Sequence, residues 1–135
     1  MKVLVTGATG FLGSVIAKTL AVKGNVDKLG RSSSDINSDL SKEVPSFTKL
    51  YDLVIHSAGK AHTVPTSKQE EEAFFNVNEL GTKNLCRALA QRPPKHFIYI
   101  STVAVYGENA APLADENEPI NALTPYAKSK MAGGE

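Results

Sequence analysis

The chain has 135 residues, of which 41% are hydrophobic, and its formal net charge is +1 at pH 7. This length predicts one domain, and the apolar content is enough to bury a core. The charges are scattered and do not form the basic patch that binding to nucleic acid or to an acidic membrane surface would need. Neither a long apolar segment nor a signal peptide is expected. The single cysteine, Cys86, excludes an internal disulfide, so a reduced, cytoplasmic setting is expected.

Extended apolar runs alternate with helical patterns along the chain. Strands are predicted over Lys2–Thr6, Val26–Arg31, Leu53–Ser57 and Phe97–Ser101. Helices are predicted over Phe11–Lys23 and Lys68–Gln91, and a further strand between residues 32 and 51 is either short or missing. This alternation favours an α/β fold with a doubly wound parallel sheet, forming one domain over residues 1–135.

The predicted helix over residues 68–91 has the clearest end signals. Ser67 and Glu70 have the spacing of a capping box, and Pro93-Pro94 follows the end of the helix. The apolar side chains expected on its inner face are Phe74, Val77, Leu85, Ala88 and Leu89. This helix is therefore expected to pack on the sheet.

Three glycines at the first strand-to-helix turn indicate a site for the pyrophosphate of a dinucleotide. In Thr6-Gly-Ala-Thr-Gly-Phe-Leu-Gly13, Gly7 permits a sharp turn and Gly10 lets the backbone approach a phosphate. Gly13 lets the helix pack close to the sheet, and the positive end of the helix then faces the anion. Because the glycines lie between an apolar strand and a helical pattern, dinucleotide binding is favoured over a plain turn.

The spacing Gly-x-x-Gly-x-x-Gly resembles the extended short-chain dehydrogenase/reductase family, which includes nucleotide-sugar epimerases and dehydratases. The resemblance implies a Rossmann fold that binds NAD(P), with no metal site. The residues that it implies for cofactor binding are Gly7, Thr9, Gly10, Phe11, Leu12, Arg31, Asp39, Leu40, Ser57, Ala58, Gly59, Asn78, Tyr126 and Lys130. Asp35-Ile36 is an alternative to Asp39-Leu40 as the pair that holds the adenine ring.

A tyrosine and a lysine four residues apart form the second strong motif. Thr124-Pro125 predicts a helix start, which places Tyr126 and Lys130 on one helix face. A cation beside a phenol favours the phenolate, so Tyr126 is a candidate general acid/base. The segment Ser101-Thr-Val-Ala-Val-Tyr-Gly107 also resembles the family, which implies that Thr102 hydrogen-bonds the reacting substrate oxygen.

Three residues between these motifs are given supporting roles. His56 is interpreted as a structural residue at a strand end. The resemblance implies that Asn78 supports the active-site loop. Gly59 stands where the family more often has alanine, and this replacement is expected to be harmless.

The end of the second predicted strand bears on the choice of cofactor. An acidic residue there would hold the ribose hydroxyls of NAD, but the chain has Gly30-Arg31-Ser32-Ser33. Arginine beside hydroxyl groups suits a 2′-phosphate. The sequence therefore favours NADP(H).

The resemblance covers the whole chain and implies an NAD(P)-dependent epimerase, dehydratase or 4-ketoreductase of a nucleotide sugar. Two alternatives remain open: a non-catalytic dinucleotide sensor and a reductase of small carbonyl compounds. Family members continue well past the lysine, so this chain is expected to be an inactive portion truncated before the substrate-binding part. A homodimer is expected for the full-length form. Gly133-Gly134 departs from the family pattern, in which a glutamate usually follows the lysine by four residues.

Overall fold

The computed structural model describes residues 1–108 and 113–135. Its centre is a five-stranded sheet in which neighbouring strands are parallel and the order is β3-β2-β1-β4-β5. The strands are β1 (Lys2–Thr6), β2 (Asn25–Gly30), β3 (Ile36–Asn37), β4 (Leu53–His56) and β5 (His96–Tyr99). This order confirms the predicted doubly wound, Rossmann-type sheet, and the uncertain strand is present as a two-residue β3.

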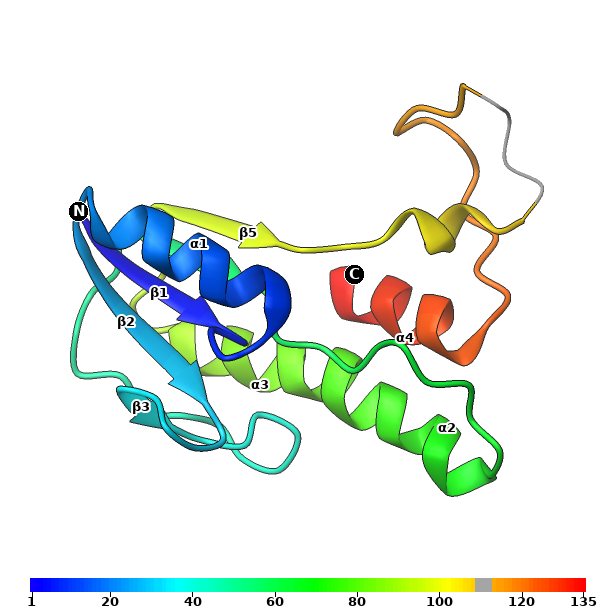
Figure 1. The fold of residues 1–135 in the computed structure, drawn as a ribbon, viewed down its shortest axis with the longest axis horizontal. Helices are drawn as coiled ribbons and strands as arrows, with labels where there is room; N and C mark the ends of the chain where they lie inside the picture. The colour runs from blue at the N-terminus through cyan, green and yellow to red at the C-terminus, as the bar shows by residue number, and fades with distance from the viewer. Residues whose placement is uncertain (109–112) are drawn as a thin grey trace.

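Helices cover both faces of this sheet. They are α1 (Phe11–Ala21), α2 (Lys68–Phe75), α3 (Gly81–Leu89) and α4 (Pro125–Gly134), with a π-helical segment η1 (Asn76–Leu80) and a 3₁₀ segment η2 (Val103–Tyr106). Figure 1 shows α1 on one side of the sheet and the continuous run of α2, η1 and α3 on the other, with α4 beside α2.

Side chains of β1 alternate between two apolar cores. Leu4 belongs to a buried cluster with Leu85 of α3, whereas Val3 and Val5 belong to a second cluster with Ala17 of α1. Successive side chains of a strand point to opposite faces, so the central strand is buried on both sides. This burial fixes the register of β1 and therefore the place where its glycine turn begins.

At the ends of elements the structure differs from the prediction by one or two residues. α1 stops at Ala21 instead of Lys23, because Asn25 already donates its N–H to Met1 O (3.1 Å) as β2 begins. The ends of β2, β4 and β5 fall one or two residues earlier than predicted, at Gly30, His56 and Tyr99. The residues just beyond these strand ends form loops instead.

The predicted helix over residues 68–91 is present but irregular. The π segment η1 interrupts it and shifts the buried face, so that Asn78 is 1% exposed and Val77 is only half-buried. At the start of α2, Ser67 Oγ accepts from Glu70 N (3.2 Å), as in a capping box. Glu70 Oε2 accepts from Thr66 N (2.6 Å), and so the second half of the box reaches one residue further back than predicted.

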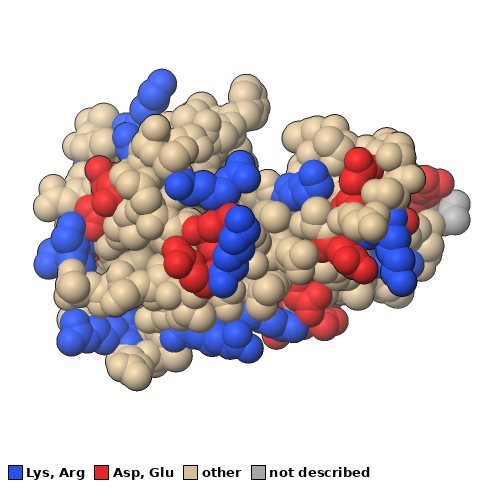
Figure 2. Space-filling model, turned by 90° about the horizontal axis from the view of Figure 1, so that it is seen from below, with Lys and Arg blue, Asp and Glu red and all other residues tan. Residues whose placement is uncertain are grey.

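Charges of both signs are mixed on the surface. Figure 2 shows lysine, arginine, aspartate and glutamate side chains interspersed on the face seen from below. Among the described ion pairs, Lys83–Glu79 (2.6 Å) and Lys95–Asp52 (2.7 Å) lie at the surface. None of the helices in the described parts of the chain is long and apolar enough to cross a membrane.

Candidate active site

A cleft of about 520 Å³ lies at the carboxyl edge of the sheet. Its walls come from the loops after β1, β2, β3 and β4, together with α2 and η1. The strand order reverses between β1 and β4, and such a switch point is where open α/β sheets bind ligands. The cleft-lining residues that the sequence analysis singled out are Gly7, Thr9, Gly10, Arg31, Asp39, Leu40, Ser57, Ala58 and Gly59.

The glycine turn has the geometry that a phosphate cradle requires. Gly7 has a φ of +66°, and a Cβ at this position would lie 2.7 Å from Ala58 Cα. A Cβ on Gly13 would overlap Gly7 O, so only glycine lets α1 approach the turn this closely. Gly10 is the N-cap of α1 and provides no side-chain cap, so no side chain of the N-cap occupies the first N–H groups of the helix.

Five of the residues predicted to bind cofactor do not line the cleft: Phe11, Leu12, Asn78, Tyr126 and Lys130. The side chains of Phe11 and Leu12 are 94% and 45% exposed. Any contact from these two residues to a dinucleotide in the cleft would therefore come from their backbone N–H groups, at the start of α1.

The structure separates the two acidic-apolar pairs. Asp39 and Leu40 line the cleft, whereas the Asp35 carboxylate accepts from Lys28 N (2.9 Å) and Asp35 is absent from the lining. The Asp39 carboxylate accepts from Ser41 Oγ (2.6 Å) and Ser41 N (3.1 Å), and the Ser41 hydroxyl is the main cause of a lowered pKa of Asp39. Of the two pairs, only Asp39-Leu40 lines the cleft, and its contact with a nucleotide stays a prediction.

His56 is a buried structural residue, as the sequence analysis interpreted it. Thr82 Oγ1 donates to Asn78 O (2.7 Å), so it accepts from His56 Nε2 (2.9 Å). On the other side, Thr6 Oγ1 accepts from Ala58 N (3.0 Å) and donates to His56 Nδ1 (2.6 Å). Burial, with a smaller effect from the Lys130 charge, lowers the pKa of His56 to about 4, so the ring is neutral.

The Asn78 side chain connects the loop at Lys60, which lines the cleft, to α4, the helix that carries Tyr126 and Lys130. Its Oδ1 accepts from Lys60 N (2.7 Å), and its Nδ2 donates to Lys60 O (3.0 Å) and Ser129 Oγ (2.9 Å). A Cβ on Gly59 would lie 3.1 Å from Asn78 Oδ1. Alanine at residue 59 would require this amide to move slightly, and glycine avoids the contact; that the replacement is harmless stays a prediction.

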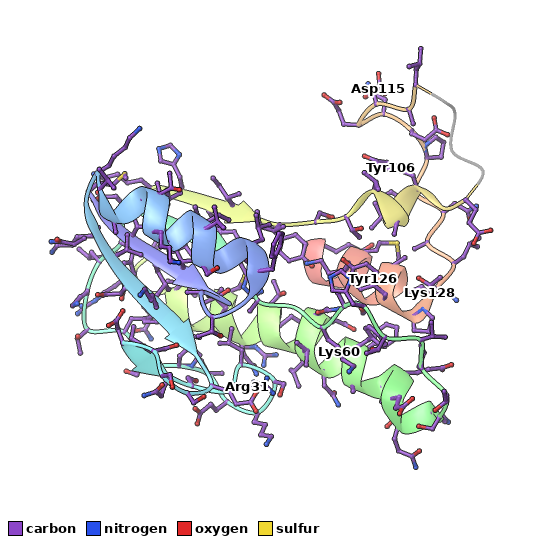
Figure 3. The ribbon with its side chains drawn as sticks, viewed as in Figure 1. Arg31, Lys60, Tyr106, Asp115, Tyr126 and Lys128 are labelled. Atoms are coloured by element: carbon purple, nitrogen blue, oxygen red, sulfur yellow. The ribbon has the colours of Figure 1, made fainter. Side chains whose placement is uncertain are left out.

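Tyr126 lies on the first turn of α4, where the sequence placed it. Thr124 Oγ1 accepts from Ala127 N (3.1 Å) and caps the helix, with Pro125 at its first position. The Tyr126 ring packs edge-on against Phe74 (6.2 Å between centroids), and Lys60 Nζ lies over the same Phe74 ring (5.3 Å). Figure 3 shows Arg31 and Tyr126 apart, with Lys60 between them in this view.

Lys130 is almost completely buried, at 5% exposed. Its ammonium donates to Ile100 O (2.6 Å) and lies 4.1 Å from the centroid of the Tyr99 ring. A Cβ on Gly59 would lie 3.9 Å from Lys130 Nζ, so the ammonium borders the cleft wall. Burial lowers the pKa of Lys130 to about 8. Stabilisation of a Tyr126 phenolate by this cation stays a prediction.

Thr102 follows β5 and caps the 3₁₀ segment η2. Its Oγ1 accepts from Ala104 N (3.2 Å) and the residue is half-buried. An accepting hydroxyl keeps its own hydrogen, so Thr102 is still able to donate to a substrate oxygen. Its predicted role and its cap role are therefore compatible.

Sequence reasoning missed two residues that organise this region. Ser129 is fully buried and donates from Oγ to Tyr126 O (2.8 Å), and Tyr99 donates its hydroxyl to Lys130 O (3.0 Å). The position of Ser129, immediately before Lys130 in the motif, was the available signal. Tyr99 had none, because an aromatic residue in a strand normally indicates packing alone.

Comparisons with known proteins agree with this geometry. Residues 3–135 match the family model described as the NAD dependent epimerase/dehydratase family. The chain is 31% identical over 98% of its length to a putative UDP-glucose 4-epimerase of Methanocaldococcus jannaschii, of which it covers 48%. It is 30% identical over 99% of its length to the N-acetyl-alpha-D-glucosaminyl-diphospho-ditrans,octacis-undecaprenol 4-epimerase of Escherichia coli O157:H7, of which it covers 42%.

A solved structure shows the same arrangement. The structure of MoeE5 in complex with UDP-glucose and NAD is 26% identical, with a TM-score of 0.81, and the match covers 99% of this chain and 47% of that one. The chain thus spans about half the length of the relatives it matches. With its glycine turn, its sheet order and this match over nearly all its residues, the chain belongs to the NAD-dependent epimerase/dehydratase family.

Proposed function

We propose that this chain supplies the cofactor site and the catalytic residues of an NAD(P)-dependent enzyme that epimerises, dehydrates or reduces a nucleotide sugar. The observation that carries the proposal is the cleft at the switch point between β1 and β4. Its glycine turn has no room for Cβ atoms at Gly7 and Gly13. A tight turn of this kind between a strand and a helix is where a pyrophosphate binds in such folds. The Asp39-Leu40 pair lines the same cleft and would hold the adenine end.

The catalytic roles follow from the placement of three side chains. Bound NAD(P) would supply hydride chemistry at the sugar carbon. Tyr126, at the capped start of α4, would take a proton from the sugar hydroxyl or return it. The Thr102 hydroxyl would donate to the same oxygen, and Lys130 would hold the nicotinamide ribose from its place beside Gly59.

The nucleotide-sugar substrate is inferred from the relatives. Proteins named as UDP-glucose 4-epimerases and dTDP-glucose 4,6-dehydratases match nearly the whole chain, and in each case the chain spans about half of the relative. We infer that substrate contacts require the remaining half, because a ligand cleft needs walls on both sides. The 135-residue chain alone should therefore bind cofactor but show no epimerase, dehydratase or reductase activity. Turnover by the isolated chain would overturn this inference.

Two features bear on the choice between NAD and NADP(H). The matched family is described as NAD dependent, and MoeE5 was solved with NAD. In this chain, however, Arg31 lines the cleft at the end of β2, where a 2′-phosphate would lie. We therefore keep NADP(H) binding through Arg31 as a testable part of the proposal.

The open alternatives differ from this proposal in measurable ways. A non-catalytic dinucleotide sensor would not need Thr102, Tyr126 and Lys130, and the presence of all three in the chain favours an enzyme. A reductase of small carbonyl compounds would use the same three residues. Assays of the complete protein with UDP-sugars and with small ketones would separate these two enzymes, and gel filtration of the complete protein would test the expected homodimer.

Calorimetric titration with NADH and NADPH tests the cofactor site directly. Gly10→Ala places a methyl group at the turn, 3.2 Å from Gly7 O, and should weaken binding of both cofactors at least tenfold. Gly81→Ala is the matched control, because its Cβ would meet Leu40 Cβ at an ordinary 3.5 Å. Equal binding by the two variants, or no binding by the unsubstituted chain, would refute the proposal.

A further inference from the structure

Tyr99 contacts Lys130 at both ends of the lysine residue. The Tyr99 hydroxyl donates to the backbone oxygen of Lys130 (3.0 Å), and the Tyr99 ring lies under its ammonium (4.1 Å to the ring centroid). The neighbouring Ile100 O accepts from the same ammonium (2.6 Å). The end of β5 therefore fixes the helix turn that carries Lys130 and also the tip of its side chain.

A buried lysine needs such partners. Burial disfavours the charged form of Lys130, and an aromatic face together with a carbonyl oxygen is an environment that holds an ammonium. Burial also raises the pKa of Tyr99 to about 12, so its hydroxyl keeps the proton that it donates to Lys130 O. The lysine side chain has a flexible four-carbon stem, and these contacts select one of its many rotamers.

Gly133, near the end of α4, makes room for this tyrosine. A Cβ on Gly133 would lie 2.8 Å from the Tyr99 hydroxyl oxygen and would overlap Asn78 O. A Cβ on Gly134 would lie 3.4 Å from Tyr99 Cε1. Both glycines are helical, although glycine is a poor helix former. Only glycine fits at residue 133, because α4 approaches Asn78 O and the Tyr99 hydroxyl closely there, whereas a Cβ at residue 134 would make an ordinary contact with the ring.

We propose that Tyr99 is a positioning residue for Lys130, holding its ammonium at the cofactor cleft through the ring face and through the bond to the helix backbone. This inference rests on the proposed function, in which Lys130 contacts the cofactor. Tyr99 itself would touch neither cofactor nor substrate. The ring is the larger contributor, because it acts on the ammonium itself.

The first test does not require cofactor. In ¹H–¹³C spectra of the chain, the ε-methylene protons of Lys130 should be shifted upfield by the ring current of Tyr99. Tyr99→Phe should keep this shift and Tyr99→Leu should abolish it. The matched control is Phe97→Leu, on the same strand, whose ring packs against His56 and is 38% exposed. A Lys130 signal at its ordinary position in the unsubstituted chain would overturn the proposal without any variant.

The second test separates positioning from general support of the fold. Tyr99→Leu should weaken NADH binding about tenfold, which is ~1.4 kcal/mol, whereas Tyr99→Phe and Phe97→Leu should stay within about threefold of the unsubstituted chain. In a Lys130→Met background, Tyr99→Leu should have no further effect. An equal loss with and without Lys130 would show that Tyr99 acts only on the fold. Absence of NADH binding by the unsubstituted chain would instead count against the proposed function.

Discussion

The proposed cofactor cleft and the proposed catalytic end of this chain, which carries Thr102, Tyr126 and Lys130, are built in different ways. At the cleft, only residues 7–10 separate β1 from α1, and the turn packs directly on the loop after β4. At the catalytic end, residues 100–124 separate β5 from α4, and apolar side chains there are open to solvent, including Val103 (83% exposed) and Ile120 (59% exposed). The cleft is therefore formed by local turns within the sheet, whereas the catalytic groups depend on contacts between distant segments.

The sharpest test of this division is Tyr126→Phe in the complete protein. Removing the phenol should lower kcat by ~10²–10⁴-fold, because proton transfer loses its donor. NADH affinity should stay within about twofold, since Tyr126 does not line the cleft. Steady-state kinetics and calorimetry measure the two effects separately. If cofactor affinity fell as far as kcat, the two regions would be one unit.

The buried His56 should make the free energy of unfolding depend on pH. Its folded-state pKa is lowered from 6.5 to about 4, so the unfolded chain binds the extra proton between these values. The free energy of unfolding should keep the full His56 contribution above pH 6.5 and should fall by about 3 kcal/mol as the pH drops toward 4. Urea denaturation between pH 4.5 and 7.5 measures this change.

A matched pair of variants assigns this pH dependence. His56→Asn should abolish most of the slope, whereas His62→Asn should retain it, because His62 is exposed and has a φ of +63° that asparagine tolerates. An unchanged slope in His56→Asn would show that other groups carry it.

Cofactor choice tests the cleft side alone. If Arg31 binds a 2′-phosphate, Arg31→Ala should weaken NADPH binding by roughly 10- to 100-fold, from a lost charge-assisted contact of ~1.5–3 kcal/mol. NADH binding should change little. Parallel titrations of both cofactors against both proteins decide the matter. A chain that already prefers NADH would show that the arginine serves another purpose.

The smallest expected effect concerns the start of α4. Thr124→Ala removes the cap and should destabilise this helix by ~0.5–2 kcal/mol, which would raise amide exchange in α4 by roughly 2- to 30-fold. Amides of α1 should be unaffected. Ser67→Ala, which removes the cap of α2, is the matched control. Faster exchange spread equally over α1 and α4 would break the proposed separation.

The sequence predicted the cleft better than the catalytic end for a physical reason. The Gly7 turn, the strand before it and the helix after it are contiguous, so local rules fix them together. The Thr124 cap could likewise be predicted from the sequence, because Ala127, whose N–H it accepts, is only three residues away.

Contacts between segments that are distant in the chain could not be predicted from the sequence. In the π segment, buried Asn78 forms hydrogen bonds with Lys60 and Ser129, and no local sequence pattern indicates either the segment or these bonds. Tyr99 and Gly133 look like an ordinary strand residue and a helix breaker until α4 is placed on β5. For the same reason, the tight fit at Gly59 appeared only once Asn78 was in place.

An NMR titration of the ¹⁵N-labelled chain with NADH tests most directly whether the cleft at the switch point binds the dinucleotide. If it does, the largest amide shifts should fall on residues 7–12, 39–40 and 57–60, around the cleft. Shifts centred instead on residues 45–49 and 87–92, around a separate cavity of about 300 Å³, or no shifts at saturating NADH, would show that the dinucleotide does not bind in this cleft.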